Sequence, residues 1–149
     1  MSVSLTEILD QLRAPGIYRL SSRARASSLI QAIERHGWHG FYLDGRAIDG
    51  KAAFLAASAQ ALRFPSYFGG NWDAFEECVT DLAWAPATGY VLLYDDVANF
   101  ARAAPAEWST ARDILAGATA NWQARGTPMY VLLRRVGPAL SRQIKESGA

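Results

Sequence analysis

The chain has 149 residues, of which half are hydrophobic and 19% are charged, with one cysteine and a formal net charge of +1. This length suits one domain with a sizeable core, and the composition is that of a folded globular protein rather than a disordered one. A single cysteine excludes an internal disulfide, no apolar run approaches the roughly 20 residues of a membrane span, and the N-terminus lacks a signal-peptide pattern, so we expect a cytoplasmic protein.

Hydrophobic periodicity and the positions of glycine and proline predict helices and strands that alternate along the chain. In the first third we expect a helix over 4–13, a strand over 16–20, a helix that ends at Gly37 and a strand over 38–43. Asp49 is the expected N-cap of a helix over 50–63, and Asn71 is that of a helix over 72–82. The remaining elements are a strand over 89–94, a short helix over 97–103, a helix over 106–124 and a strand over 128–134.

This alternation favours the α/β class, with a small parallel β-sheet packed with helices; the sheet has three strands, or four if the N-terminal segment adds one. We divide the chain into an N-terminal extension (1–37) that packs on the same domain, the main domain (38–136) and a basic, polar tail (137–149). No internal repeat or low-complexity linker separates these parts.

The charges are segregated along the sequence. Residues 64–101 contain six acidic residues and no lysine or arginine, whereas the other 111 residues hold all 15 basic residues against eight acidic ones. The two parts therefore carry −6 and +7, and such segregation is typical of a chain that presents an acidic face to a basic partner. A core segment that is simply poor in charge would also lack basic residues, so the positions of the acids decide between the two interpretations.

The acids of the predicted 72–82 helix fall on one side of it, together with Thr80, and the other side is apolar. The spacing i, i+3, i+4 and i+8 places them in one contiguous row, here called the acidic strip: Asp73, Glu76, Glu77 and Asp81. No lysine or arginine on this helix or in the adjoining loops can pair with the strip. A solvated helix face is the plain alternative, but solvated faces usually mix charges of both signs.

An aromatic loop, residues 64–71, leads into this helix and carries Tyr67, Phe68 and the glycine pair 69–70. Recognition surfaces are often built on such loops. Tyr67 and Phe68 are either core anchors or binding residues, and the glycines relax the backbone geometry before the helix. Trp84 follows the helix and is either a core residue or part of the border of the same surface.

The loop and the helix together resemble a known family. The matching residues are Pro65-Ser66-Tyr67-Phe68-Gly69-Gly70-Asn71-Trp72-Asp73-Ala74-Phe75, followed by Cys78-Val79-Thr80. They are similar to the loop and recognition helix of the barstar family, and the flanking segments agree in order and spacing over about 38–135. The resemblance implies a compact fold with a small parallel sheet, and an intracellular inhibitor that plugs the active site of a barnase-like ribonuclease with carboxylates in the places of RNA phosphates.

The resemblance also implies roles for individual residues. Those that match the family's own residue types are Tyr67, Gly69, Asn71, Asp73 and Thr80. Glu77 stands where the family has its most important aspartate, Glu76 replaces a contacting tryptophan, and Asn121 falls at the position of a later contact glutamate. Phe68, Asp81 and Trp84 complete the expected partner-binding set. The departures concern the identity of the target more than the mode of binding.

Few residues are available for other chemistry. His36 and His39 lack neighbouring cysteines or carboxylates for a metal site, and we expect them to cap a helix and to flank a strand. Cys78 lies on the apolar side of its helix and is expected to be a core thiol. Asp95 and Asp96 are either half of a metal site or, more simply, an N-cap for the next helix. The basic remainder of the chain favours a solvated surface over a nucleic-acid site.

These features predict a non-enzymatic, antitoxin- or immunity-like inhibitor that binds a basic, barnase-like ribonuclease, expected to be one to one. We expect no cofactor, no metal, no membrane and no direct nucleic acid. The alternative is a non-inhibitory interaction module that binds another basic protein through the same surface. A less favoured alternative is a nucleic-acid-binding regulator that uses the basic remainder.

Overall fold

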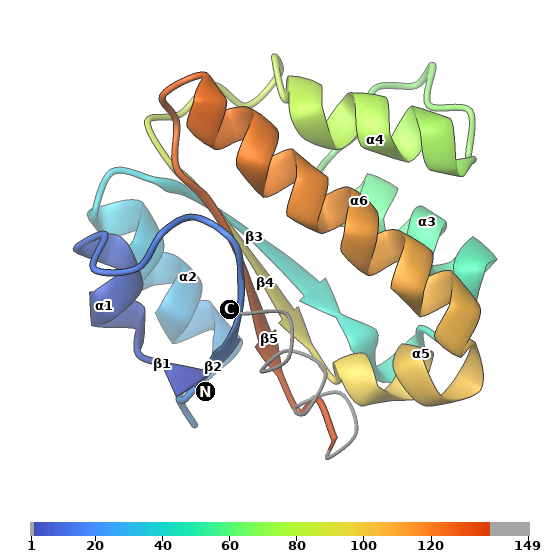
Figure 1. Cartoon of the computed structure of the whole chain (residues 1–149), viewed down its shortest axis with the longest axis horizontal. Coiled ribbons are helices and arrows are strands. Elements are labelled where there is room, and N and C mark those ends of the chain that lie inside the picture. The colour runs from blue at the N-terminus through green and yellow to red at the C-terminus, as the bar shows by residue number, and fades with distance from the viewer. Residues whose placement is uncertain (1, 138–149) are drawn as a thin grey trace.

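Five strands form one fully parallel sheet in the computed structural model, which describes residues 2–137 (Figure 1). The strands are β1 (Ser2–Val3), β2 (Ile17–Leu20), β3 (His39–Asp44), β4 (Tyr90–Asp95) and β5 (Met129–Arg134). Their order across the sheet is β1-β2-β5-β4-β3. Every residue of β4 and β5 is buried, as expected for parallel strands that are covered on both faces.

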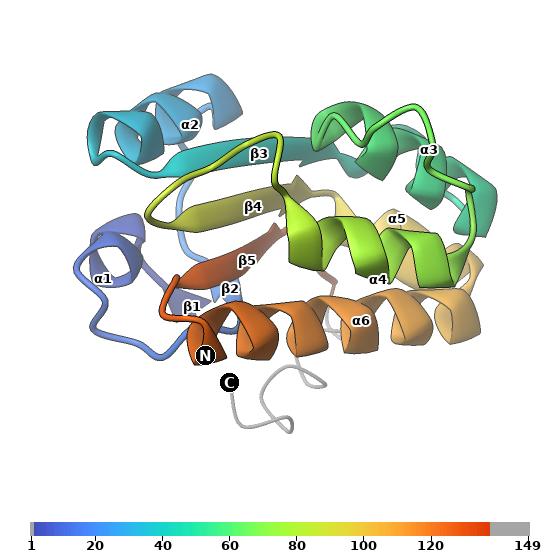
Figure 2. The same ribbon diagram turned by 90° about the horizontal axis from the view of Figure 1, so that it is seen from above.

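Helices cover the two faces of the sheet unequally (Figures 1 and 2). One face carries α1 (Leu5–Leu9) and α2 (Ala26–Arg35). The other carries α3 (Lys51–Ala61), α4 (Trp72–Asp81), α5 (Val97–Ala103) and α6 (Pro105–Ala124), and a 3-10 turn (Gly45–Ala47) follows β3. Among residues 2–137, no helix combines the length and the apolar character needed to cross a bilayer.

Two apolar cores result, because successive side chains of a strand point to opposite faces. Tyr90, Leu92 and Tyr94 of β4 belong to the larger core, which lies beneath α3–α6. Val91 and Leu93 belong to the smaller core, which packs against α1 and α2. The faces of α4 and α6 that meet the larger core are thereby fixed, and their opposite faces are left to solvent.

The N-terminal segment adds two strands to the sheet. β1 pairs with β2, and β2 pairs with the central strand β5 with Ile17 opposite Val131. The hydroxyl of Tyr130 on β5 donates to the carbonyl of Arg13 at 2.6 Å. The segment therefore shares both the sheet and a core with the rest of the chain.

The expected α/β class with a parallel sheet is confirmed, but the expected three or four strands are too few. Ser2–Val3 is the additional strand, and two residues are too short to show a periodic pattern. The helix expected over 4–13 ends at Leu9, because the chain turns at Gln11 with a left-handed φ of 55°. Asp49 is not an N-cap, since α3 begins after Gly50 without a side-chain cap. The tail expected over 137–149 lies outside the described residues except for Gly137.

Candidate protein-binding site

Local sequence determines where α4 begins and ends. The Oδ1 atom of Asn71 accepts a hydrogen bond from the backbone N–H of Ala74 at 2.8 Å, which confirms the predicted N-cap. Gly70 adopts a φ of +72°, a conformation that favours glycine, in the turn before the helix. Asp73 lies in the first turn, where the helix dipole favours a negative charge. Leu82 ends the helix in the left-handed conformation.

Contacts from α3 and α6 hold α4 in place. Phe75, Cys78 and Val79 are buried in its inner face. The indole Nε1 of Trp72 donates to Glu107 on α6 at 3.2 Å. Near the other end, the indole of Trp122 on α6 donates to the Val79 carbonyl at 3.0 Å. The helix that carries the acidic strip is thus attached along its length, side by side with α6 (Figures 1 and 2).

The four carboxylates of the acidic strip are exposed. None of them forms an ion pair with any residue in the described part of the chain, where the ion pairs involve other acids. Like charges at this spacing repel by roughly 0.2–0.5 kcal/mol per exposed pair. Apart from the favourable position of Asp73 in the first turn, the strip therefore adds no evident stability to the free protein, and its carboxylates remain exposed.

The two aromatic residues of the loop lie in different environments. Phe68 packs against Phe64 with ring centroids 5.0 Å apart, at the edge of the larger core. Tyr67 is 70% exposed. The pKa of its phenol is raised, first by partial loss of solvent and then by the negative charge of Asp81, with a smaller effect of Glu77. Tyr67, in the loop directly before α4, is thus close enough to Asp81 and Glu77 to be affected by their charge.

The remaining expected binding residues differ in exposure. Gly69 and Asn71 are exposed at the start of α4, and Asn121 is exposed on α6, directly before Trp122. The hydroxyl of Thr80 donates to the Glu76 carbonyl at 2.7 Å within α4. Trp84 is half-buried and its Nε1 donates to the Leu62 carbonyl at 2.8 Å, so its contacts tie it to the interior of the domain.

The sequence did not predict one cation that lies at this surface. Arg125 follows α6, and the Cζ atom of its guanidinium lies 3.8 Å from the ring centroid of Trp122. Its Nη2 donates to the carbonyl of Thr80, at the C-terminal end of α4. The interaction joins residues 45 positions apart, and no local sequence pattern signals it. A cation in this place is favourable to the helix dipole of α4.

The other candidate residues serve structural roles. Among residues 2–137, no group of three or more His, Cys, Asp or Glu side chains is placed to hold a metal ion. Asp95 is buried in an ion pair with Arg134. The N-cap expected at Asp96 is wrong in its chemistry, because the side chain makes no cap bond and instead accepts from Arg135 at 2.8 Å. Cys78 is a buried thiol whose pKa is raised by burial.

Fold and site together define a small α/β protein with an exposed acidic surface on one attached helix. The family model for barstar (barnase inhibitor) matches residues 38–134. This is about two-thirds of the chain, and the chain belongs to the barstar family. A comparison with curated proteins gives no match. The matched range excludes β1, α1, β2 and α2, which are the elements of the N-terminal extension.

Proposed function

We propose that this protein inhibits a basic, barnase-like ribonuclease by covering its active site with the acidic strip and Tyr67. The main supporting observation is that four exposed carboxylates on one attached helix have no ion-pair partner among the described residues. An exposed tyrosine precedes the same helix. Membership of the barstar family supports the same proposal. The inhibitor acts one to one in the cytoplasm, without a cofactor, as an antitoxin or immunity protein does.

The chemistry of the two surfaces is complementary. A ribonuclease binds a polyanion, so its active site is rich in cationic side chains. Carboxylates on a helix that is capped by Asn71 and bonded to α6 are ordered before binding, which reduces the entropy lost on association. The local negative charge of the acidic strip also accelerates encounter with a basic surface, and this effect weakens as salt is added.

Two departures from the family pattern shape the proposed target. Glu77 reaches one methylene further than an aspartate would, so the cation that it meets lies deeper or the target surface is more open. Glu76 is exposed and charged at a position where the family has an aromatic contact. The target is therefore expected to place a further cationic side chain, rather than an apolar pocket, opposite Glu76.

The test is a titration of basic guanyl-type ribonucleases with the purified chain. Activity is expected to fall linearly to zero at one equivalent of inhibitor. Asp73→Ala with Glu77→Ala is expected to weaken inhibition by about tenfold or more per carboxylate, since each change leaves a cation of the target without a partner. Glu34→Ala with Asp113→Ala is the matched control, because it removes two exposed carboxylates from other elements.

Three results would contradict the proposal. If the chain leaves several such nucleases fully active, it is not an inhibitor of this class. If it binds one of them without lowering its activity, and the Asp73/Glu77 change abolishes that binding, the surface belongs to a non-inhibitory interaction module. Equal loss of inhibition in the control pair would show that net charge alone is responsible.

A further inference from the structure

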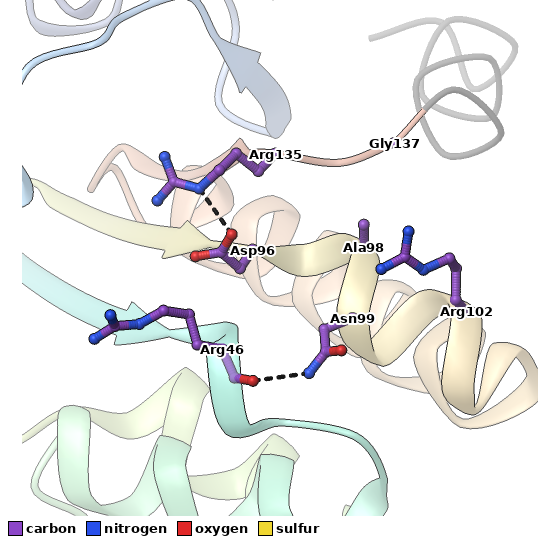
Figure 3. A pocket seen from close by; sticks show the side chains of 7 residues that line it. All are labelled: Arg46, Asp96, Ala98, Asn99, Arg102, Arg135 and Gly137. Carbon is purple, nitrogen blue, oxygen red and sulfur yellow. Dashed lines mark hydrogen bonds and ion pairs between the residues drawn. The ribbon is translucent and has the colours of Figure 1, made fainter.

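A second surface lies at the carboxyl end of the sheet, away from α4. Two adjoining hollows of about 400 and 360 Å³ share Arg46, Asp96 and Arg135, and we call them together the strand-end crevice. Figure 3 shows the first hollow, which Asn99 and Arg102 of α5 also line. The further residues of the second hollow include Arg23, Arg25, Tyr42, Asp95 and Arg134.

The topology of the sheet makes this edge a natural binding position. Ligands of open parallel sheets bind outside the carboxyl ends of the strands, where neighbouring connections leave toward opposite faces. The segment after β2 leads to α2 on one face, whereas the segment after β4 leads to α5 on the other. The strand-end crevice lies between these diverging connections.

Positive charge predominates in the crevice. Six arginines line it, namely Arg23, Arg25, Arg46, Arg102, Arg134 and Arg135. The acids of this region are already engaged: Asp44 binds Arg46 at 2.7 Å, Asp95 binds Arg134 at 2.7 Å, and Asp96 binds Arg135 at 2.8 Å. Within residues 2–137, the guanidinium groups of Arg23, Arg25 and Arg102 have no acidic partner. An excess of three positive charges results.

Arg134 holds the N-terminal part of the crevice in position. It is 6% exposed, and its Nη1 donates to the carbonyls of Ser22 and Ala24 at 3.1 and 2.7 Å. These carbonyls flank Arg23, so the segment that carries Arg23 and Arg25 is fastened to the end of β5. Both arginines belong to the N-terminal extension, outside the range that the barstar family model matches.

We propose that the strand-end crevice binds a small phosphate-bearing ligand through Arg23, Arg25 and Arg102. Guanidinium groups bind phosphate oxygens in pairs and are weakly hydrated, which suits them to this role. The size of the hollows is near the lower end of ligand pockets, about 300–1,000 Å³. Because the two hollows meet at Arg46 and Arg135, a ligand with more than one phosphate can contact guanidinium groups of both. The chemistry is that of a diphosphate, either free or as part of a nucleotide.

A long RNA fits these residues less well. Tyr42 is the aromatic residue of the lining, and its ring is partly buried against the smaller core, so it is not an exposed stacking platform. The crevice also shares no lining residue with the acidic strip or Tyr67. The proposal is therefore independent of nuclease inhibition.

Calorimetric titration of the full chain tests the proposal, with pyrophosphate, ADP and adenosine as separate probes. One molecule of pyrophosphate or ADP is expected to bind per chain, and adenosine is expected not to bind. Tighter binding of ADP than of pyrophosphate would identify a nucleotide, and the reverse would identify free diphosphate. Arg23→Gln with Arg25→Gln is expected to weaken binding by about tenfold or more. Arg35→Gln with Arg63→Gln, which removes the same charge from exposed positions outside the crevice, is expected to change it less than about threefold.

Asp96→Asn is expected to change the affinity for phosphate in the opposite direction. The change removes one of the two acids that pair with Arg135 and leaves its 3.1 Å contact with Asp95. It also keeps a residue type that tolerates the left-handed backbone at this position. Binding is expected to tighten severalfold, whereas Asp113→Asn elsewhere on the surface leaves it unchanged. The proposal is overturned if neither pyrophosphate nor ADP binds at millimolar concentration, if the control pair weakens binding equally, or if only long RNA binds.

Discussion

Replacement of Arg134 by methionine tests the buried Asp95–Arg134 ion pair, which positions the guanidinium that also binds the carbonyls of Ser22 and Ala24 in the N-terminal extension. Arg134 is 6% exposed and Asp95 is 1% exposed, and two hydrogen bonds of 2.7 and 2.8 Å connect them. Methionine fills most of the same volume but leaves the Asp95 carboxylate with only the Tyr42 hydroxyl at 3.0 Å and Arg135 at 3.1 Å among its described partners. Breaking a buried pair typically costs about 3–5 kcal/mol. Because two partners remain, we expect a loss of about 3 kcal/mol in the free energy of unfolding.

The loss should depend on pH with a defined sign. Burial alone would raise the pKa of Asp95, but the hydrogen bonds from Arg134 and Tyr42 and the nearby positive charges lower it below its usual value of 3.8. A carboxyl whose pKa is lowered by folding stabilises the protein above its unfolded pKa, and this stabilisation is lost as the pH falls through the folded pKa. The deficit of Arg134→Met is therefore expected to be largest near neutral pH and to shrink as the pH falls below about 4.

Urea unfolding at pH 7 and at acid pH measures the effect. Arg135→Met is the matched control, since Arg135 is 56% exposed and we expect it to cost less than about 1 kcal/mol. Adding Asp95→Asn to Arg134→Met should recover part of the stability, because no unpaired charge is then buried. A loss below about 1 kcal/mol at pH 7, or an equal loss at every pH, would refute the stabilising role assigned to this buried ion pair.

Three further changes test other parts of the structure. Asn71→Ala removes the N-cap of α4 and should lower the free energy of unfolding by about 1 kcal/mol in urea, whereas no change would show that the cap is dispensable. Gly89→Ala places a Cβ atom inside the contact distance of the Trp38 ring, so we expect a loss of about 1–3 kcal/mol and altered tryptophan fluorescence; wild-type values would contradict the packing. Burial and the hydrogen bond to Asp95 raise the pKa of Tyr42 to about 12, so the contribution of Tyr42 to the free energy of unfolding should be present below pH 10 and lost as the pH rises toward 12. Unfolding curves of Tyr42→Phe should show a smaller loss of stability at alkaline pH, and an unchanged loss would contradict this assignment.

The sequence predicted the elements whose signals are local. The N-cap at Asn71, the spacing of the acids and the apolar runs of β4 and β5 each lie within a few residues, and the structure has all three. The strand β1 was missed because its two residues acquire meaning only by pairing with β2. Asp96 stands at the predicted N-cap position of α5, but its side chain binds Arg135, 39 residues away, and does not cap the helix.

The candidate site shows the same division between local and distant signals. The sequence alone left Tyr67 and Phe68 with the same two alternatives, and only the position of Phe64 in the folded chain separates the packed ring from the exposed one. Arg125 is a comparable case, since it reaches Thr80 because α4 and α6 pack together. Distances of this kind are set by the tertiary arrangement and have no counterpart in a periodic pattern.

The place of Arg125 has a consequence for partner discrimination. A protein that covers the whole length of α4 meets four negative charges and then, at the Thr80 end, a guanidinium that is stacked on Trp122. A uniformly cationic surface matches the first part and repels the last, whereas a surface with an acceptor opposite Arg125 matches both. Selectivity of this kind rests on an unfavourable contact with the wrong partner as much as on a favourable contact with the right one. The order of charges along the helix, rather than their sum, would then separate the proper target from the many other basic proteins of a cell.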